Sequence, residues 1–248
     1  MAALTIFCTF VATIKQQTMS PIATMFDRIS PKYDRLNHLL SLNIDKVWRR
    51  KTAKIMANYH PKNILDLATG TADLAIALAK HNPQAHIIGV DISEKMLDIG
   101  REKVRKKGLE NQIELQLGDA AALPFEDNSF DTVTVAFGVR NFENMKQGIS
   151  EIHRVLKPTG MAFILEFSMP KKFPVKQLYT LYFKHILPKI GKWVSKDASA
   201  YTYLPESVER FPKPLDFLGM LSSSGLIEGT MRHFGHGIAT LYWVIKSK

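Results

Sequence analysis

The chain has 248 residues, of which 46% are hydrophobic, and a formal net charge of +10 at pH 7. This length and composition predict a globular protein with a sizeable core and exclude a largely disordered chain. The single cysteine, Cys8, excludes an internal disulfide framework and fits a reducing compartment. The basic charge favours an anionic partner, either a nucleic acid or an anionic membrane surface.

The chain begins with an apolar stretch, Leu4 to Ile14, that is too short to span a membrane. No basic segment precedes this stretch and no convincing cleavage pattern follows it, so the sequence favours a disordered or loosely docked leader over a signal peptide. We assign residues 1–24 to this leader and residues 25–248 to one folded domain. Residues 25–60 are expected to form a helical cap, with a turn near Ser41.

A strand, a tight turn and a helix are predicted between Asn63 and His81. The apolar run Asn63–Leu67 contains Asp66, small residues follow it, and an apolar-periodic helix starts at Asp73. This arrangement brings a nucleotide-like ligand close to bare backbone at a helix N-terminus. A second strand, His86–Val90, is followed by Asp91, an acid that can accept hydrogen bonds from both hydroxyls of a ribose.

The turn lacks the Gly-x-Gly-x-x-Gly of dinucleotide sites. It is similar to the acid-x-Gly-x-Gly-x-Gly turn of S-adenosylmethionine (SAM) methyltransferases, with alanine at two of the three glycine positions, Ala68 and Ala72. SAM carries an amino acid, a sulfonium and a ribose but no phosphate, so acids and small residues suit it better than a phosphate-binding nest. An ordinary turn between a strand and a helix is the alternative interpretation.

A third acid strengthens the SAM interpretation. The strand Ile113–Leu117 is followed by Gly118, by Asp119, which can accept the adenine amino group, and by Ala120, which can pack on the adenine ring. Acids thus end three consecutive strands, at the edge where open α/β sheets bind ligands. The residues expected to bind the cofactor are Asp66, Gly70, Thr71, Asp91, Ile92, Asp119, Ala120 and Ala136.

The rest of the chain continues the alternation of strands and helices. Up to residue 167 the expected elements are a helix at Ser93–Lys107 with Ser93 as its N-cap, a strand at Phe130–Phe137, a helix at Asn144–Leu156, a turn at Lys157–Gly160 and a strand at Met161–Phe167. A basic, aromatic and partly helical lid insertion is expected at 169–203. The chain is expected to end with a helix at Pro205–Ser224 and a hairpin of Leu226–Arg232 and Ile238–Lys246. This order predicts an α/β fold with a mostly parallel seven-stranded sheet, one antiparallel strand and helices on both faces, the Rossmann-like fold of class I SAM-dependent methyltransferases.

Four motifs carry a more specific resemblance. They are YDRLNHLLSLNIDKVW at Tyr33–Trp48, FGVRN at Phe137–Asn141, RVLKPTGMAFILEFS at Arg154–Ser168 and YLPESVERFP at Tyr203–Pro212. In this order they resemble the ubiquinone/menaquinone biosynthesis C-methyltransferases over roughly Met25 to Lys248. The resemblance implies methyl transfer from SAM to a ring carbon of a polyprenyl quinol. We expect demethylmenaquinol to be converted to menaquinol; the alternative is the methoxy-benzoquinol precursor of ubiquinone, or both substrates.

Three residues depart from the family pattern. Asp45 replaces a histidine, which argues against an essential base at that position. Thr159 replaces a glycine in a turn, which it is expected only to retune. Ala72 replaces the last glycine of the SAM turn, and this replacement has little effect if its φ is negative.

The chemistry requires a nucleophilic ring carbon more than it requires a metal. A sulfonium is already a strong electrophile, and His233 and His236 lack a third ligand, so no metal site is expected. A phenol that loses its proton pushes electron density onto the neighbouring carbon, and a cation beside the forming phenolate favours that loss. Arg140 is the candidate cation, with Asn141 and Tyr33 orienting a water or a quinol hydroxyl. A structural ion pair for Arg140, and core packing for Tyr33, are the alternatives.

A basic segment suggests how the protein reaches its substrate. The lysines 171, 172, 176, 184, 189, 192 and 196 alternate with aromatic and aliphatic residues, with no acid between them. This pattern is typical of a basic amphipathic helix on an anionic bilayer, although an RNA surface can share it. We expect a cytoplasmic enzyme, peripheral on the inner face of the cell membrane, that takes no nucleic acid and is compatible with a homodimer. An RNA or small-molecule methyltransferase and a non-enzymatic SAM-binding module are the alternatives.

Overall fold

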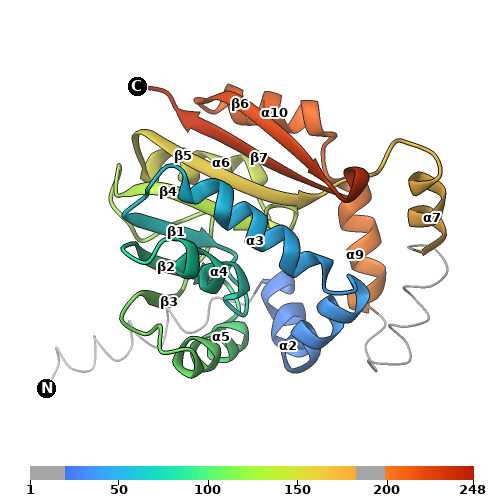
Figure 1. Ribbon diagram of the computed structural model, residues 1–248, viewed down its shortest axis with the longest axis horizontal. Coiled ribbons are helices and arrows are strands. Elements are labelled where there is room, and N and C mark those ends of the chain that lie inside the picture. Colours follow the sequence, from blue (N-terminus) through green and yellow to red (C-terminus); the bar gives the residue numbers. More distant parts are fainter. Residues whose placement is uncertain (1–19, 183–198) are drawn as a thin grey trace, which may run out of the picture.

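One seven-stranded sheet organises the protein, whose computed structural model describes residues 20–182 and 199–248 (Figure 1). The strands lie in the order β3-β2-β1-β4-β5-β7-β6. They are β1 (Asn63–Leu67), β2 (His86–Asp91), β3 (Ile113–Leu117), β4 (Phe130–Ala136), β5 (Leu156–Phe167), β6 (Leu226–Phe234) and β7 (Ala239–Lys246). Neighbouring strands pair in parallel except that β7 runs antiparallel to β5 and to β6. The predicted sheet with one reversed strand is confirmed.

Helices cover both faces of this sheet. Those in the described residues include α2 (Pro21–Leu40), α3 (Ile44–Ala57), α4 (Asp73–His81), α5 (Glu94–Lys106), α6 (Met145–Val155), α7 (Val175–Leu181), α9 (Ser199–Arg210) and α10 (Pro214–Ser223). Because side chains alternate along a strand, Ile64 packs into the core under α3 and α4 while Leu65 and Leu67 pack into the core under α6 and α10. Apolar residues are therefore needed on both faces of the central strands.

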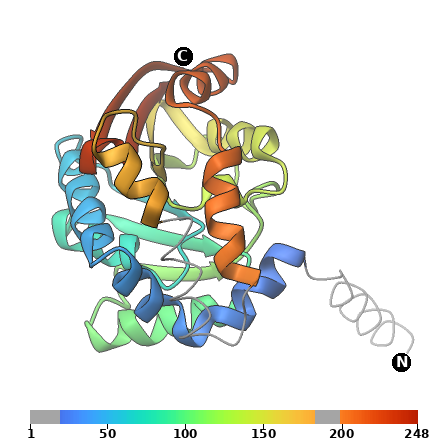
Figure 2. The ribbon, with the colours of Figure 1, turned by 90° about the vertical axis from the view of Figure 1, so that its right-hand side faces the viewer.

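The side towards which the parallel strands point carries additional helices. Figures 1 and 2 show α2, α7 and α9 gathered there, beyond the ends of β1, β4 and β5. These helices surround the edge where the predicted ligand-binding acids lie. Within the described part of the chain, no helix is long and apolar enough to cross a membrane.

Helix α2 begins earlier than the sequence suggested. The Ser20 hydroxyl accepts a hydrogen bond from the Ala23 amide at 3.3 Å, and Pro21 occupies the first helical position, which suits a residue without an amide proton. Ala23 is buried. Residues 21–24 therefore belong to the helix and not to a leader; Ser20 caps this helix, and residues 1–19 of the expected leader lie outside the described residues. The expected turn near Ser41 is confirmed between α2 and α3.

Strand β5 also differs from its prediction. The expected turn at Lys157–Gly160 lies within a strand that already starts at Leu156. Leu156 pairs with Phe130 and Met161 pairs with Thr132, so the intervening residues form an irregularity in the ladder, with Thr159 at φ 65°. The pairing with β4 on both sides of the irregularity makes this segment one strand. Of the lid insertion at 169–203, residues 183–198 lie outside the described residues, and with them four of the seven lysines.

Candidate functional site

The turn after β1 has an alternating backbone conformation. Ala68, Gly70 and Ala72 have φ values of 51°, 56° and 63°, so each position of the glycine template is left-handed. The negative φ under which alanine at position 72 would have little effect is not present: Ala72 carries its methyl group in a conformation that favours glycine. A Cβ atom added to Gly70 would meet no protein atom within 4 Å, so open space lies against this part of the backbone.

Asp91 is held by backbone amides at the end of β2. Its carboxylate accepts hydrogen bonds from the Gly70 amide at 2.8 Å and from the Ser93 amide at 2.9 Å. Burial raises the pKa of Asp91 to about 6, against the opposing effect of these amide donors. The Ser93 hydroxyl in turn accepts from the Met96 amide at 3.2 Å, which confirms the predicted N-cap of α5.

Asp66 lies beneath the same turn and is held by hydroxyls. The Thr69 and Thr134 hydroxyls each donate to its carboxylate at 2.7 Å. Burial raises the pKa of Asp66 to about 6 as well. The two acids therefore present buried carboxyls that ionise near neutral pH at one edge of the sheet.

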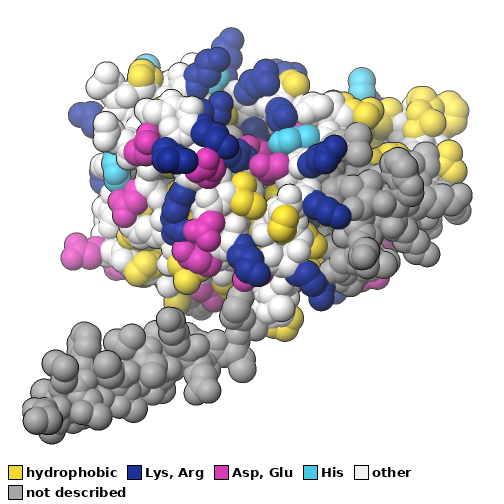
Figure 3. Space-filling view, turned by 90° about the horizontal axis from the view of Figure 1, so that it is seen from below, with side chains coloured by type: hydrophobic (Ala, Val, Ile, Leu, Met, Phe, Trp, Pro, Cys, Tyr) yellow, Lys and Arg dark blue, Asp and Glu magenta, His cyan; other side chains and the backbone are white. Residues whose placement is uncertain are grey.

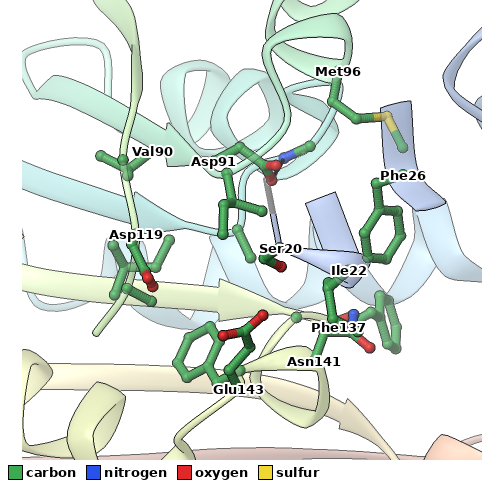
Figure 4. A pocket seen from close by; sticks show the side chains of 18 of the residues that line it. Ser20, Ile22, Phe26, Val90, Asp91, Met96, Asp119, Phe137, Asn141 and Glu143 are labelled. Atoms are coloured by element: carbon green, nitrogen blue, oxygen red, sulfur yellow. Dashed lines mark hydrogen bonds between the residues drawn. The ribbon is translucent and has the colours of Figure 1, made fainter. Parts of the chain in front are cut away.

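A cleft of about 720 Å³ lies in front of these strand ends. Six of the predicted cofactor-binding residues line it: Gly70, Asp91, Ile92, Asp119, Ala120 and Ala136. Figure 4 shows Asp91 and Asp119 across the cleft from Ile22 and Phe26, which come from α2. Sequence reasoning assigned Ile22 to the leader and placed Phe26 in the helical cap without linking it to the cofactor, so it missed this wall. The Ser20-Pro21 capping signal would have revealed the helix.

The remaining two predicted residues, Asp66 and Thr71, line a smaller polar pocket of about 400 Å³ that shares Gly70 and Ala136 with the cleft. Asp34, His38 and Asp73 also line this pocket and lie close enough together to hold a cation. Lys103 already supplies positive charge there, because its ammonium pairs with Asp34 at 2.9 Å and with Asp73. Asp34, His38 and Asp73 therefore form an ion-pair network together with Lys103.

A third cavity, of about 1320 Å³, is predominantly apolar and is walled by α2, α3 and α7. Its lining residues include Trp48, Phe137, Phe167, Leu178, Tyr179 and Leu204. Tyr33 lines all three spaces, so the cleft, the polar pocket and the apolar cavity meet at this side chain. Burial raises the pKa of Tyr33, although Arg49 and Arg140 act in the opposite direction, so its hydroxyl stays protonated at neutral pH.

Arg140 is fixed in the wall of the apolar cavity. Its guanidinium pairs with the Glu166 carboxylate at 2.7 Å, donates to the Phe137 carbonyl oxygen at 2.5 Å and donates to the Ser207 hydroxyl at 3.3 Å. Glu166 is fully buried, on β5. The structural ion pair considered as an alternative for Arg140 is thus present, and its acid lies on a strand. Asn141 lines the cofactor cleft and accepts a hydrogen bond from the Tyr203 hydroxyl at 2.9 Å.

Arg49 was missed by the sequence reasoning. It lines both the polar pocket and the apolar cavity, and it pairs with Asp45 one turn earlier on α3. Asp45 is buried and also accepts hydrogen bonds from the Ser41 hydroxyl at 2.6 Å and from His38 at 3.0 Å. Asp45 thus holds three neighbouring side chains, Ser41, His38 and Arg49, through one carboxylate.

Comparison with known proteins gives consistent results. Residues 12–246 match the model of the ubiE/COQ5 methyltransferase family. The chain is 46% identical over 225 residues to a demethylmenaquinone methyltransferase from Bacteroides fragilis, covering 91% of this chain and 92% of that protein. It is 43% identical over 222 residues to a ubiquinone/menaquinone biosynthesis C-methyltransferase from Geobacter sulfurreducens, covering 89% of this chain and 86% of that protein.

Solved structures share the fold at much lower identity. A SAM-dependent methyltransferase from Aquifex aeolicus superposes with a TM-score of 0.58 and 18% identity, covering 78% of this chain and 88% of that one. The [4+2]-cyclase SpnF superposes with a TM-score of 0.64 and 15% identity, covering 93% of this chain and 96% of that one. A cyclase and a methyltransferase thus share this architecture, so function has to be argued from the site.

Proposed function

Because the chain belongs to the ubiE/COQ5 methyltransferase family, we propose that it transfers a methyl group from SAM to a ring carbon of a polyprenyl quinol, converting demethylmenaquinol to menaquinol. The observation that carries this proposal is the meeting of an acid-lined cleft and a large apolar cavity at Tyr33 and Phe137. One space suits a polar nucleoside-like cofactor and the other suits an apolar ring with a long tail.

The residues of the cleft fit SAM. Asp91 would accept hydrogen bonds from the ribose hydroxyls, Asp119 would accept from the adenine amino group, and Asp66 in the polar pocket would face the amino group of the methionine part. Gly70 leaves the space beside the backbone open. When bound, SAM supplies an electrophilic methyl group on its sulfonium.

Arg140 supports the loss of the phenolic proton. Its guanidinium is pre-positioned by Glu166 and by the Phe137 carbonyl oxygen in surroundings that exclude most water, so it can stabilise a developing phenolate without rearranging. The electron pair released into the ring forms the new bond from carbon to the methyl group, and loss of the proton on that carbon restores the aromatic ring. Tyr33 and Asn141 orient the hydroxyl. Glu166 is a positioning residue, because it acts through Arg140.

The test of this function is turnover of labelled SAM with a short-tailed demethylmenaquinol under reducing conditions, beside the methoxy-benzoquinol precursor and RNA. Methylation of the naphthoquinol alone supports the menaquinone reaction, and methylation of both quinols supports the broader alternative. Methylation of RNA, or SAM binding without turnover of any acceptor, would contradict the proposal.

Removal of Arg140 tests its role in that reaction. Arg140→Ala should lower turnover by a factor on the order of 10² while SAM affinity stays nearly unchanged. The variant leaves Glu166 buried without its partner, which destabilises proteins by roughly 3–5 kcal/mol. The double variant Arg140→Met/Glu166→Gln removes both charges and should show the same loss of turnover with a smaller loss of melting temperature. Arg105→Ala, at an exposed arginine on α5, is the control; a fully active double variant would restrict Arg140 to structure.

We further propose that the mouth of the apolar cavity rests on the inner face of an anionic cell membrane. Leu42, Ile44 and Leu178 line the cavity and are also exposed to solvent, as is Phe173 nearby in sequence. Figure 3 shows hydrophobic side chains gathered at the end of the molecule where Figure 1 places α7. The lysines 171, 172 and 176 accompany this segment and suit anionic headgroups. A polyprenyl tail would then remain in the bilayer while its ring enters the cavity. A homodimer, if formed, would have to leave the mouth of the apolar cavity uncovered.

A further inference from the structure

Two arginines each lie against one ring of a stacked pair of phenyl rings in the wall of the apolar cavity. The guanidinium carbon of Arg140 lies 5.3 Å from the ring centre of Phe167, and that of Arg49 lies 5.0 Å from the ring centre of Phe137. The two rings are stacked with their centres 4.4 Å apart. The sum of these three distances limits the separation of the two guanidinium carbons to at most about 15 Å.

Arg49 has unused hydrogen-bonding capacity. Within the described residues, the hydrogen bonds it donates all come from one terminal nitrogen, which binds Asp45. Its side chain is only 11% exposed, so the other guanidinium nitrogens have little access to solvent. Arg49 thus has N–H donors at the boundary between the polar pocket and the mostly apolar cavity, both of which it lines.

A quinol brings two oxygens into this cavity, at opposite positions of the ring. Each hydroxyl loses its bonds to water on burial and needs a protein partner. Arg140 serves the oxygen beside the methyl-accepting carbon under the proposed function. Among the described residues that line the cavity, Arg49 is the other positively charged donor. Charge-assisted hydrogen bonds at both oxygens require two donors, and Arg140 and Arg49 are two separate cations in the lining of the same cavity.

We propose that Arg49 binds the second quinol oxygen, the one opposite the hydroxyl that Arg140 helps to ionise. This inference rests on the proposed function and extends it to the recognition of the substrate. Asp45 is then a positioning residue, because its bonds to Ser41 and His38 hold the carboxylate that holds Arg49. The hydrogen bond from Arg49 to the second oxygen has the same strength in the ground state and in the transition state of methyl transfer. Arg49 therefore contributes to affinity and not to the chemical step.

The decisive experiment compares two acceptors. One is a short-tailed demethylmenaquinol, and the other is the same naphthalene with only the hydroxyl beside the methyl-accepting carbon. The wild type should favour the diol in kcat/KM by roughly 10- to 100-fold, as expected for a hydrogen bond to a charged group. Arg49→Met should raise KM for the diol by that factor, leave KM for the mono-hydroxy compound unchanged, and change kcat for both by less than about threefold.

Binding without turnover gives a second readout. Trp48 lines the cavity, so quenching of its fluorescence should report the affinity for each acceptor. The double variant Arg49→Met/Asp45→Asn avoids a buried unpaired acid and should behave like the single variant. Arg50→Met, at the exposed neighbour on α3, is the control and should match the wild type.

Three results would overturn the inference. Equal losses for both acceptors would show that Arg49 supports the structure and not the second oxygen. A large rise in the Kd for SAM, measured by calorimetry, would assign Arg49 to the carboxylate of the methionine part. A wild type that does not discriminate between the two acceptors would show that no residue reads the second oxygen. A wild type that methylates neither acceptor would instead contradict the proposed function itself.

Discussion

The two buried acids of the cofactor cleft differ in what holds them. Asp66 accepts hydrogen bonds from two hydroxyls, which can rotate and also accept. Asp91 accepts from two backbone amides, one at each carboxylate oxygen, and amides can only donate. The same substitution should therefore have opposite consequences at the two positions.

Asp66→Asn should stabilise the protein at pH 8 in the absence of SAM. The folded-state pKa of Asp66, about 6, lies above its ordinary value of 3.8, so the folded protein binds the extra proton between these values and its stability falls as the pH rises through this window. An amide removes that penalty, by on the order of 2 kcal/mol, and can donate to either threonine hydroxyl. Urea unfolding at pH 4 and pH 8 should show the gain only at pH 8.

The matched control is Asp91→Asn. Its amide group would face a backbone N–H, donor against donor, so this variant should gain nothing at pH 8 and should lose stability at pH 4. Both variants should bind SAM more weakly by calorimetry. Equal stability of Asp66→Asn and the wild type at pH 8 would show that burial does not penalise the ionised form of Asp66.

The alanine at the end of the SAM turn offers a second test. Ala72 has φ 63°, a conformation that disfavours an L-residue by about 1–2 kcal/mol, whereas Ala75 lies inside α4. Both are fully buried. Ala72→Gly should therefore destabilise the protein less than Ala75→Gly by at least about 1 kcal/mol, because glycine relieves the first position and weakens the helix at the second. Urea midpoints measure the difference, and equal losses would contradict it.

At the scale of elements, α2 connects the cofactor cleft to the rest of the fold. Asp27 accepts a hydrogen bond from the Ser93 hydroxyl at 2.5 Å, and Asp34 binds Thr71 and Lys103. Ile22 and Phe26 of the same helix form the outer wall of the cleft. A ligand in the cleft therefore contacts both the sheet edge and the helix that covers it.

Hydrogen exchange should report this contact. With saturating SAM, the backbone amides from Met25 to Arg28 should exchange at least about tenfold more slowly, because a ligand that binds only the closed arrangement adds its binding energy to that arrangement. The amides of α10, which packs mainly against β6 and β7, should not change. Equal protection of the two helices would indicate a global effect and not closure of α2.

The elements also show what sequence reasoning can achieve. Asp66, Asp91 and Asp119 were identified because each lies at or just after the end of an apolar run, and parallel strands bring their ends to one edge. Arg49 and Glu166 were not, because their roles depend on contacts with residues far apart in the sequence. The irregularity in β5 was read as a turn because Pro158 and Gly160 signal a turn locally, whereas pairing with β4 decides the structure. Nothing in the local sequence indicates the left-handed φ of Ala72, because alanine does not favour that conformation.

At the scale of the whole molecule, the position of the cavity mouth predicts how the protein meets a membrane. The double variant Phe173→Ser/Leu178→Ser removes exposed apolar side chains from the end that carries α7. It should float less with anionic vesicles and should raise KM for a long-tailed quinol while leaving KM for a short-tailed analogue unchanged. Leu215→Ser, at a residue on α10 whose exposure lies between those of Leu178 and Phe173, is the control.

Salt and competitors complete this test. Vesicle binding of the wild type should weaken with added salt, since lysine attraction to headgroups is screened within about 10 Å at 0.1 M ionic strength. Negligible flotation of the wild type with both anionic and neutral vesicles would reject the membrane surface. Tight binding of RNA that displaces the vesicles would favour the alternative partner.

Tyr33 lies on α2 and lines every one of the three spaces described around it. The methyl donor and the methyl acceptor therefore share a wall. When one of them binds and orders α2, the other binds to a helix that is already ordered. The two substrates should bind with positive heterotropic cooperativity. Thermodynamic reciprocity then fixes a relation that no single contact reveals: the factor by which SAM tightens the binding of the quinol must equal the factor by which the quinol tightens the binding of SAM.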